Sequence, residues 1–163
     1  MQIVVRMLRA EDIKPLARIE AETFSMPWSE NAFRELLERP YCSYFVALAE
    51  DQVVGGAGCI NLCGEMNIDN VVVAQSHRNQ GIGQLLLQEL IAAGEKEGVR
   101  AFTLEVRVSN AAAIHLYEKN GFRSEGIRPR FYEKPTEDAM IMWRRQETAE
   151  ESPEPENVRF YGF

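Results

Sequence analysis

The most constraining stretch of the sequence is residues 70–98, where the spacing of apolar residues changes from one period to another. Residues 70–73 (NVVV) form a short apolar run typical of a buried strand. Beyond a glycine-containing segment at 78–83 (RNQGIG), apolar side chains recur at helical spacing, among them Leu86, Leu90 and Ala93. A strand followed by a glycine loop and an amphipathic helix predicts a helix packed on a sheet, and therefore an α/β domain with a mixed sheet.

Similar patterns predict the other elements. Strands are expected at 3–8, 44–63, 66–73, 101–106, 122–127 and 137–143, and the second of these is a hairpin that turns at Asp51–Gln52. Helices are expected at 12–24, 26–40, 81–98 and 111–121. Ser29 is the expected N-cap of the second helix, and Gly121 closes the fourth. The order β-α-α-β-β-β-α-β-α-β-β describes helices arranged around one sheet.

The chain divides by composition into a body, residues 1–146, and a tail, residues 147–163. The 163 residues suit one domain with a sizeable core. The tail is rich in Glu and Pro, and its five acids against Arg159 account for −4 of the net charge of −7. Its aromatic end (VRFYGF) does not fit a purely solvated segment. That end is expected to dock on the body, on a second copy, or across the cleft where an acceptor binds.

Composition also argues against several classes of protein. The sequence contains no basic stripe of the kind that predicts direct nucleic-acid binding. No apolar run has the length of a membrane span, and the N-terminus lacks a signal-peptide core, so we expect a cytoplasmic protein. The three cysteines and two histidines form no metal-binding spacing, so no metal is expected. The cysteines (Cys42, Cys59 and Cys63) are expected to be reduced, small core residues.

The glycine segment at 78–83 is a candidate anion site. Backbone N–H groups at the start of a helix lack helical partners, and the helix dipole favours negative charge there. Glycine lets the backbone approach a phosphate without a Cβ in the way. The segment lacks the ending of a P-loop and the full pattern of a dinucleotide fold. On spacing alone, an ordinary helix-entry loop is equally consistent.

Residues 103–122 (TLEVRVSNAAAIHLYEKNGF) carry the candidate proton-transfer groups. Glu105 alternates with apolar neighbours, so it is either one member of a solvated strand face or a placed general base. Tyr117 lies at helical spacing from Ala113 and Ile114, so it is either a core residue or a general acid. Asn110 is a natural N-cap for the alanine-rich helix.

Four segments together resemble the acetyl-coenzyme A core of the Gcn5-related N-acetyltransferases. They are 26–33 (MPWSENAF), 70–83 (NVVVAQSHRNQGIG), 104–122 (LEVRVSNAAAIHLYEKNGF) and 137–142 (EDAMIM). The finer resemblance, over roughly residues 3–145, is to the bacterial ribosomal-protein-alanine N-acetyltransferases, the RimI family. It implies a central, mostly antiparallel sheet with splayed strands flanked by helices. It also implies acetyl-CoA as co-substrate and an acetyltransferase domain at 1–146.

The resemblance assigns a role to each matching position. Glu105 matches the general base, and Tyr117 matches the general acid that protonates the departing thiolate. The positions implied to hold the coenzyme are Val71, Val72 and Val73 on the strand, Arg78, Asn79, Gln80, Gly81, Ile82, Gly83 and Gln84 at the pyrophosphate, and Asn110 at the arm. Two departures are Asn79, where relatives often carry a basic residue, and Phe131, which replaces one of two adjacent tyrosines.

The acceptor follows from the same resemblance and from amine chemistry. An N-terminal α-amine has a reference pKa near 8 and is about one-tenth neutral at pH 7, so one carboxylate suffices to activate it. We expect a basic protein N-terminus, the terminal alanine of a small-subunit ribosomal protein, and a monomer or weak dimer. The alternatives are another amine (a different N-terminus, a lysine or a small molecule) and a non-catalytic acyl-CoA-binding module.

Overall fold

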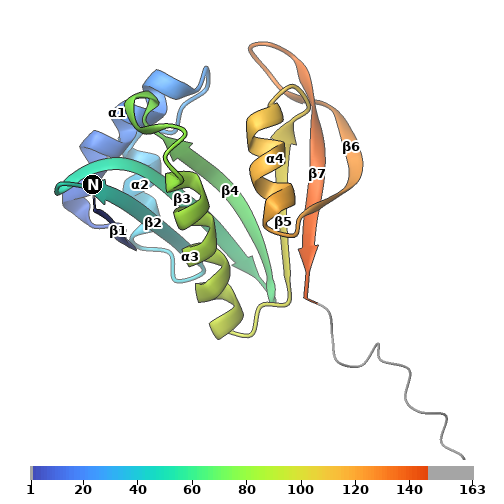
Figure 1. Ribbon diagram of the computed structural model, residues 1–163, viewed down its shortest axis with the longest axis horizontal. Coiled ribbons are helices and arrows are strands. Elements are labelled where there is room, and N and C mark those ends of the chain that lie inside the picture. The colour runs from blue at the N-terminus through green and yellow to red at the C-terminus, as the bar shows by residue number, and fades with distance from the viewer. Residues whose placement is uncertain (1, 147–163) are drawn as a thin grey trace, which may run out of the picture.

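The computed structural model of the protein describes residues 2–146 (Figure 1). Within them the elements follow the expected order, with two short 3₁₀ turns in addition, η1 (Ala10–Asp12) and η2 (Gln75–His77). The expected docking of the tail at 147–163 lies outside the described residues. The division of the chain at residue 146 stays a prediction.

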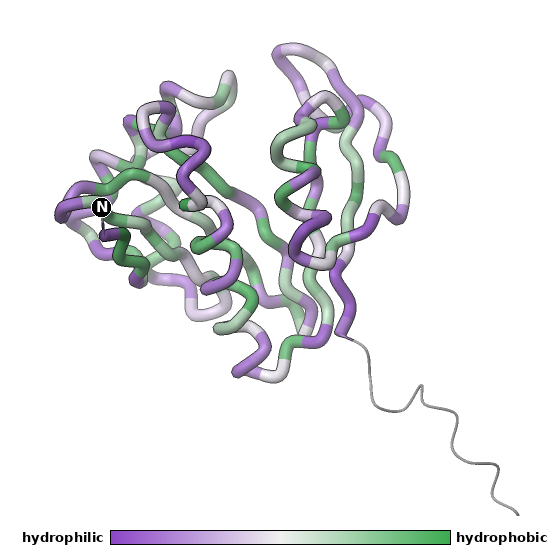
Figure 2. Tube along the Cα trace, in the orientation of Figure 1, coloured by the Kyte–Doolittle hydropathy of each residue, from purple (hydrophilic) through white to green (hydrophobic). Residues whose placement is uncertain are grey.

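One sheet of seven strands forms the centre of the molecule. Its spatial order is β1-β2-β3-β4-β5-β7-β6, and β4–β5 is its one parallel pair (Figure 1). The strands are β1 (Ile3–Met7), β2 (Cys42–Ala49), β3 (Gln52–Leu62), β4 (Glu65–Val73), β5 (Ala101–Arg107), β6 (Arg123–Tyr132) and β7 (Glu137–Arg145). Figure 2 shows hydrophobic stretches in the sheet and hydrophilic ones in the turn between β6 and β7.

Helices cover both faces of the sheet. They are α1 (Ile13–Thr23), α2 (Glu30–Leu36), α3 (Ile82–Lys96) and α4 (Ala111–Lys119). One core cluster joins the apolar faces of α3 and α4 to the sheet, and a second joins α1 and α2 to its other face. The start of α2 is capped as expected, since the Ser29 hydroxyl accepts a hydrogen bond of 3.1 Å from the N–H of Ala32.

Two glycines of β3 allow a tyrosine to lie flat against the sheet. A Cβ added to Gly56 or Gly58 would lie 2.5 Å or 2.4 Å from the ring of Tyr44, closer than carbon atoms can approach. Tyr44 itself is 2% exposed and meets Phe33 edge-on at 5.5 Å between ring centroids. The glycine-rich composition of this strand is therefore a packing requirement.

The parallel pair β4–β5 separates partway along its length. Pairing runs from Glu65 opposite Ala101 to Ile68 opposite Leu104. A β-bulge follows immediately at Asp69, because Gly58 and Cys59 of β3 pair with Asn70 and Ile68. Beyond this point β4 and β5 diverge (Figure 1). The expected splayed strands are thus present.

Local expectations differ from the structure in several places. The second helix, expected at 26–40, is shorter, because α2 spans only Glu30–Leu36. The first hairpin turns at Glu50–Asp51, one residue earlier than expected, and both residues have positive φ, as a tight two-residue turn requires. Strand β6 extends to Tyr132 rather than ending at 127, because β7 pairs with it out to that residue. Cys63 is exposed in the turn after β3 and is not a core residue, whereas Cys42 and Cys59 are buried as expected.

Candidate active site

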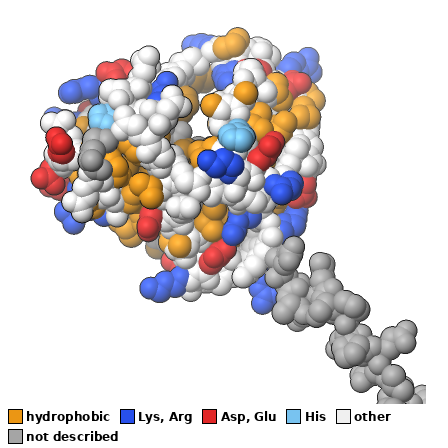
Figure 3. All heavy atoms as spheres, in the orientation of Figure 1, with side chains coloured by type: hydrophobic (Ala, Val, Ile, Leu, Met, Phe, Trp, Pro, Cys, Tyr) orange, Lys and Arg blue, Asp and Glu red, His pale blue; other side chains and the backbone are white. Residues whose placement is uncertain are grey.

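The free edge of β4 is the first component of the candidate site. Residues Val71–Val73 pair with β3 on one side and have no ladder partner on the β5 side. Backbone N–H and C=O groups that point into this gap can pair with the amides of an extended ligand. Figure 3 shows an opening through the molecule between the part that carries α3 and the part that carries α4.

The start of α3 is the second component. Asn79 and Gly81 have φ of +61° and +79°, which turns the chain sharply into the helix. The first helical hydrogen bond is donated by the N–H of Leu85 to the carbonyl of Gly81, at 3.1 Å. The three N–H groups before it point beyond the helix end, and nothing lies within 4 Å of a Cβ built on Gly81. This geometry suits a phosphate group.

The side chains of the loop at 78–83 differ in their exposure and in their contacts. Asn79 and Gln80 are exposed, whereas Ile82 is buried in the core and offers only its backbone. The guanidinium of Arg78 donates to the carbonyl of Val73 at 3.2 Å, so it lies back over the end of β4. The loop therefore presents mainly backbone N–H groups.

Asn110 and Gln84 both make contacts within the protein. The Asn110 side chain accepts a hydrogen bond of 3.2 Å from the N–H of Ala113, so it caps α4 as the sequence suggests. The Gln84 side chain pairs with the side chain of Asn120, immediately after α4. These contacts engage both side chains, while the backbone N–H of Gln84, in the first turn of α3, has no helical partner.

Glu105 lies one residue past the last position of β5 that pairs with β4. It faces the α1 and α2 side of the sheet, opposite the buried Leu104 and Val106. Its side chain is 21% exposed. The nearest polar groups are the Asn67 amide at 3.5 Å and the Arg128 guanidinium at 4.0 Å. The carboxylate therefore borders the gap between β4 and β5 while remaining accessible to an incoming amine.

Tyr117 approaches from the opposite face. It is 8% exposed on α4 and packs edge-on against Phe122, with ring centroids 5.9 Å apart. Burial raises the pKa of its hydroxyl well above the usual range, and the nearby hydroxyl of Tyr132 adds to that effect. The hydroxyl therefore stays protonated at neutral pH, which a general acid requires.

Two residues near Glu105 were missed by the sequence reasoning. Tyr132 on β6 lies under the Arg107 guanidinium, 4.6 Å from its ring centroid. Burial raises the pKa of Tyr132 to about 12, and the negative charge of Glu105 adds to the rise. Desolvation raises the pKa of Asp69 at the bulge to about 6, and the negative charge of Glu105 again adds to the rise. Asp69 is exposed, so water screens part of this effect.

Tyr132 and Asp69 differ in whether the sequence carried any signal for them. Tyr132 was detectable as the second aromatic residue of the pair with Phe131. Asp69 gave no signal, because a bulge depends on pairing with β3 rather than on local sequence.

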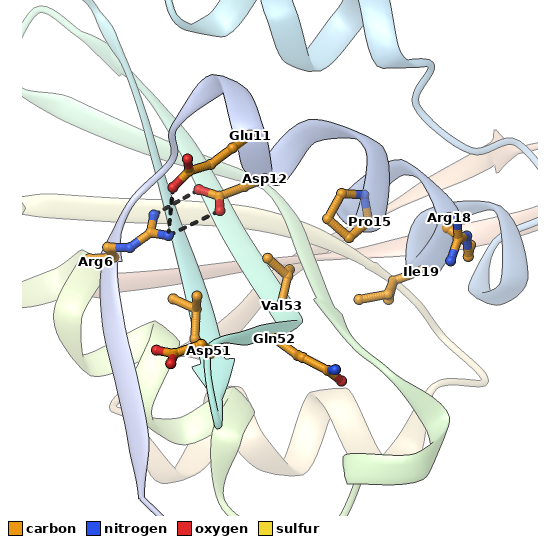
Figure 4. A pocket seen from close by; sticks show the side chains of 10 residues that line it. Arg6, Glu11, Asp12, Pro15, Arg18, Ile19, Asp51, Gln52 and Val53 are labelled. Carbon is orange, nitrogen blue, oxygen red and sulfur yellow. Dashed lines mark hydrogen bonds and ion pairs between the residues drawn. The ribbon is translucent and has the colours of Figure 1, made fainter.

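A cavity of about 490 Å³ lies elsewhere, between β1, α1 and the β2–β3 hairpin (Figure 4). Two of its charged groups are paired: the Arg6 guanidinium donates to both carboxylate oxygens of Asp12, at 2.7 and 3.1 Å. Among residues 2–146 no group of three or more His, Cys, Asp or Glu side chains is arranged to hold a metal ion. None of the helices in residues 2–146 combines the length and the apolar composition of a membrane-spanning segment.

Comparison with known proteins decides the family. Residues 13–122 match the family model described as acetyltransferase (GNAT) family. The chain belongs to this family. A GNAT acetyltransferase uses acetyl-CoA, so the protein is an acetyl-CoA-dependent N-acetyltransferase, and the resemblance found in the sequence is confirmed.

Individual relatives match over nearly their whole length. The [ribosomal protein bS18]-alanine N-acetyltransferase of Escherichia coli is 36% identical over 149 residues, which is 85% of this chain and 94% of that protein. A Bacillus subtilis protein provisionally named for the same activity is 37% identical over 140 residues, 85% of this chain and 93% of that one.

Solved structures agree with the fold. The crystal structure of the ribosomal-protein-S18-alanine N-acetyltransferase from Escherichia coli has a TM-score of 0.84 at 33% identity, covering 93% of this chain and 98% of that one. The PaiA N-acetyltransferase of Thermoplasma acidophilum, solved in complex with coenzyme A, has a TM-score of 0.74 at 20% identity. The match covers 89% of this chain and 99% of that one. The expected mostly antiparallel sheet flanked by helices is confirmed.

Proposed function

We propose that this protein transfers the acetyl group of acetyl-CoA to the N-terminal alanine α-amine of the small-subunit ribosomal protein bS18. The observation that carries the proposal is the likeness to enzymes named for that reaction, which extends over 94% of the Escherichia coli protein. Such an acceptor implies a basic protein N-terminus as partner and a cytoplasmic location.

The coenzyme is assigned to the gap between β4 and β5 and to the start of α3. The backbone of Val71–Val73, apart from the Val73 carbonyl that accepts from Arg78, is available to pair with the pantetheine amides. The N–H groups of the first α3 turn are available to the pyrophosphate. Acetyl-CoA supplies a thioester that an amine can attack. An unpaired N–H of β4 next to the carbonyl would stabilise the developing negative oxygen.

The two candidate proton-transfer residues act on opposite sides of the sheet. Glu105 faces the side of α1 and α2, and it accepts the proton that the α-ammonium must lose before attack. Tyr117 extends from α4 on the other side and gives its proton to the thiolate as it leaves. This arrangement supports a direct transfer in which amine and coenzyme enter from different faces.

A peptide assay tests the proposal. A basic peptide that begins with Ala and carries one internal Lys is incubated with acetyl-CoA, and the acetylated position is mapped by mass spectrometry. One acetyl group on the α-amine is the expected result, with none on a peptide whose N-terminus is blocked. Acetylation of the lysine alone would replace the proposed acceptor class, and coenzyme binding without turnover on any amine would favour an acyl-CoA-binding module.

The same assay with Glu105→Gln tests the base. This change keeps the shape of the side chain but removes its ability to accept a proton. The rate at saturating substrates is expected to fall by about 10²-fold or more. A rate within about twofold of wild type would remove Glu105 from the mechanism.

A further inference from the structure

Gln84 and Asn120 form a reciprocal pair of hydrogen bonds. The Gln84 amide nitrogen donates to the Asn120 side-chain oxygen at 2.9 Å, and the Asn120 amide nitrogen donates to the Gln84 side-chain oxygen at 2.7 Å. Both residues are only partly exposed, so water competes less for these bonds than at an open surface. Asn120 also donates to the carbonyl of Leu116 at 2.8 Å, which fixes its side chain against α4.

This pair joins two helices that belong to different parts of the sheet. Gln84 lies in the first turn of α3, which packs chiefly on β2, β3 and β4. Asn120 is the C-cap of α4, which follows β5, and the next residue, Gly121, lies close to Arg144 of β7. The pair therefore connects the β4 side of the opening to the β5 side (Figure 1).

A second contact brings the same helices together at the same place. A Cβ built on Gly83 would lie 3.2 Å from a methyl group of Leu116, which is tighter than most carbon contacts. A glycine at this position lets α3 approach α4 closely enough for the neighbouring Gln84 to reach Asn120. By contrast, the strands below these helices pair only as far as Ile68 and Leu104.

We propose that the Gln84–Asn120 pair is a clasp that sets the width of the coenzyme slot between β4 and β5. The inference rests on the proposed placement of the coenzyme in that gap. Without the clasp the shared core still holds the two sides together, but the first turn of α3 and the end of α4 lose their fixed spacing. Coenzyme binding must then restore an order that the wild-type protein already has. Gln84 and Asn120 are thus positioning residues for coenzyme binding.

The clasp also gives Gln84 a role different from the one implied by family resemblance. Its side-chain amide is engaged with Asn120, so the side chain is committed to α4 rather than to the pyrophosphate. Its backbone N–H still belongs to the first turn of α3 and remains available to an anion. The two roles make opposite predictions for changes at Asn120.

Titration calorimetry with coenzyme A on the full chain distinguishes the two roles of the Gln84 side chain, contact with Asn120 and contact with the pyrophosphate. Gln84→Leu and Asn120→Leu are each expected to raise the Kd by about tenfold, the effect of losing two neutral hydrogen bonds of modest net strength. The double variant should be no weaker than either single variant, because both changes break the same contact. The KM for the acceptor peptide should stay within about twofold, since the acceptor enters elsewhere.

Two further variants control for general damage. Gln84→Asn combined with Asn120→Gln keeps the combined length of the pair and should recover most of the coenzyme affinity. Gln88→Leu changes an exposed glutamine one turn further along α3 and should leave the Kd unchanged. If Asn120→Leu proves too unstable to titrate, Asn120→Ala takes its place, because it removes the amide without adding a branched side chain or a charge.

Each remaining outcome decides between explanations. A weaker Kd in Gln84→Leu with an unchanged Kd in the Asn120 variants would overturn the clasp and restore direct contact with the coenzyme. Unchanged affinity in all variants would also overturn it. Failure of the wild-type protein to bind coenzyme A would instead refute the proposed coenzyme site, so the two failures are distinguishable.

Discussion

At the scale of single residues, the proposed general acid Tyr117 shows how burial changes the acidity of a hydroxyl. Its hydroxyl lies among apolar side chains that raise its pKa, so the proton is retained at neutral pH. A leaving thiolate, whose conjugate acid has a pKa near 8.5, is a weaker base than the phenolate of this tyrosine, so proton transfer to the sulfur is uphill. The hydroxyl therefore contributes by hydrogen bonding to the negative charge that develops on the sulfur. A core position and a catalytic role are therefore compatible for this residue.

Replacing Tyr117 with Phe tests this role. The ring contact with Phe122 is kept, so the fold and coenzyme affinity should change little, whereas kcat should fall by about 10²-fold. Wild type should show no alkaline loss of kcat from this tyrosine below about pH 10, because its pKa is raised. A kcat in the variant that matches wild type would assign the proton to another donor.

Asp69 provides a prediction about stability and pH. Its pKa in the folded protein, about 6, lies above that of an unfolded aspartate near 3.9. Between these values the folded state binds more protons, so the free energy of unfolding falls as pH rises from about 4 to 6 and then levels off. Asp69→Asn removes this decline.

Thermal melts across pH 4–8 measure the effect. At pH 7.5 the variant should melt higher than wild type, by no more than about 3 °C because water screens an exposed carboxylate. The difference should become small near pH 4, where Asp69 is protonated in the folded state and about half protonated in the unfolded state. A constant difference at every pH would show that the charge of Asp69 is not responsible.

At the scale of elements, the bulge at Asp69 determines which β4 side chains face which helices. Before it, Met66 and Ile68 face the cluster under α3; after it, Val72 faces the cluster under α1. One extra residue in the strand therefore reverses the alternation. It also turns Asn70 toward α1, where the Tyr44 hydroxyl donates to its side-chain oxygen at 2.7 Å.

A buried glutamate of α1 completes this connection. The Asn70 amide donates to both carboxylate oxygens of Glu20, at 3.0 and 3.1 Å, and the N–H of Trp28 donates to one of them at 3.4 Å. Glu20 is 1% exposed. Burial raises its pKa, and the hydrogen bond from Asn70 opposes that rise. The network ties the α1–α2 loop to the strand that borders the slot.

Glu20→Leu should therefore destabilise the protein by about 3 kcal/mol, since it leaves the buried Asn70 amide without its acceptor. Glu20→Gln retains one acceptor oxygen and should cost less than about half as much. Urea unfolding followed by tryptophan fluorescence gives both values. Equal losses in the two variants would mean that volume, rather than hydrogen bonding, determines the stability at this site.

At the scale of the whole molecule, ligand binding should stabilise both sides of the slot together. Coenzyme A at 100 times its Kd is expected to add about 2.7 kcal/mol to the free energy of unfolding. For a protein of this size the melting temperature should rise by about 5–10 °C. Scanning fluorimetry with coenzyme A, and with adenosine diphosphate as a partial ligand, measures the shift; no shift with saturating coenzyme A would contradict the assigned slot.

The body and tail are also distinguished at this scale. Residues 2–146 contain all seven strands of the described sheet and both core clusters, so a chain ending at residue 146 is expected to fold and to keep full activity. Its melting temperature and kcat are compared with those of the full chain. A faster truncated enzyme would indicate that residues 147–163 obstruct the acceptor.

The amino-acid sequence by itself determined the order of the elements, the glycine loop at 78–83 and the family. Each of these depends on patterns within about thirty residues, such as apolar spacing and the residues that end a helix. The tertiary structure alone decided the bulge at Asp69, the position of Tyr132 near Glu105, and the pairing of Gln84 with Asn120. These depend on strand register and helix approach between distant segments, and no local pattern records such pairing because many registers satisfy the same alternation of side chains.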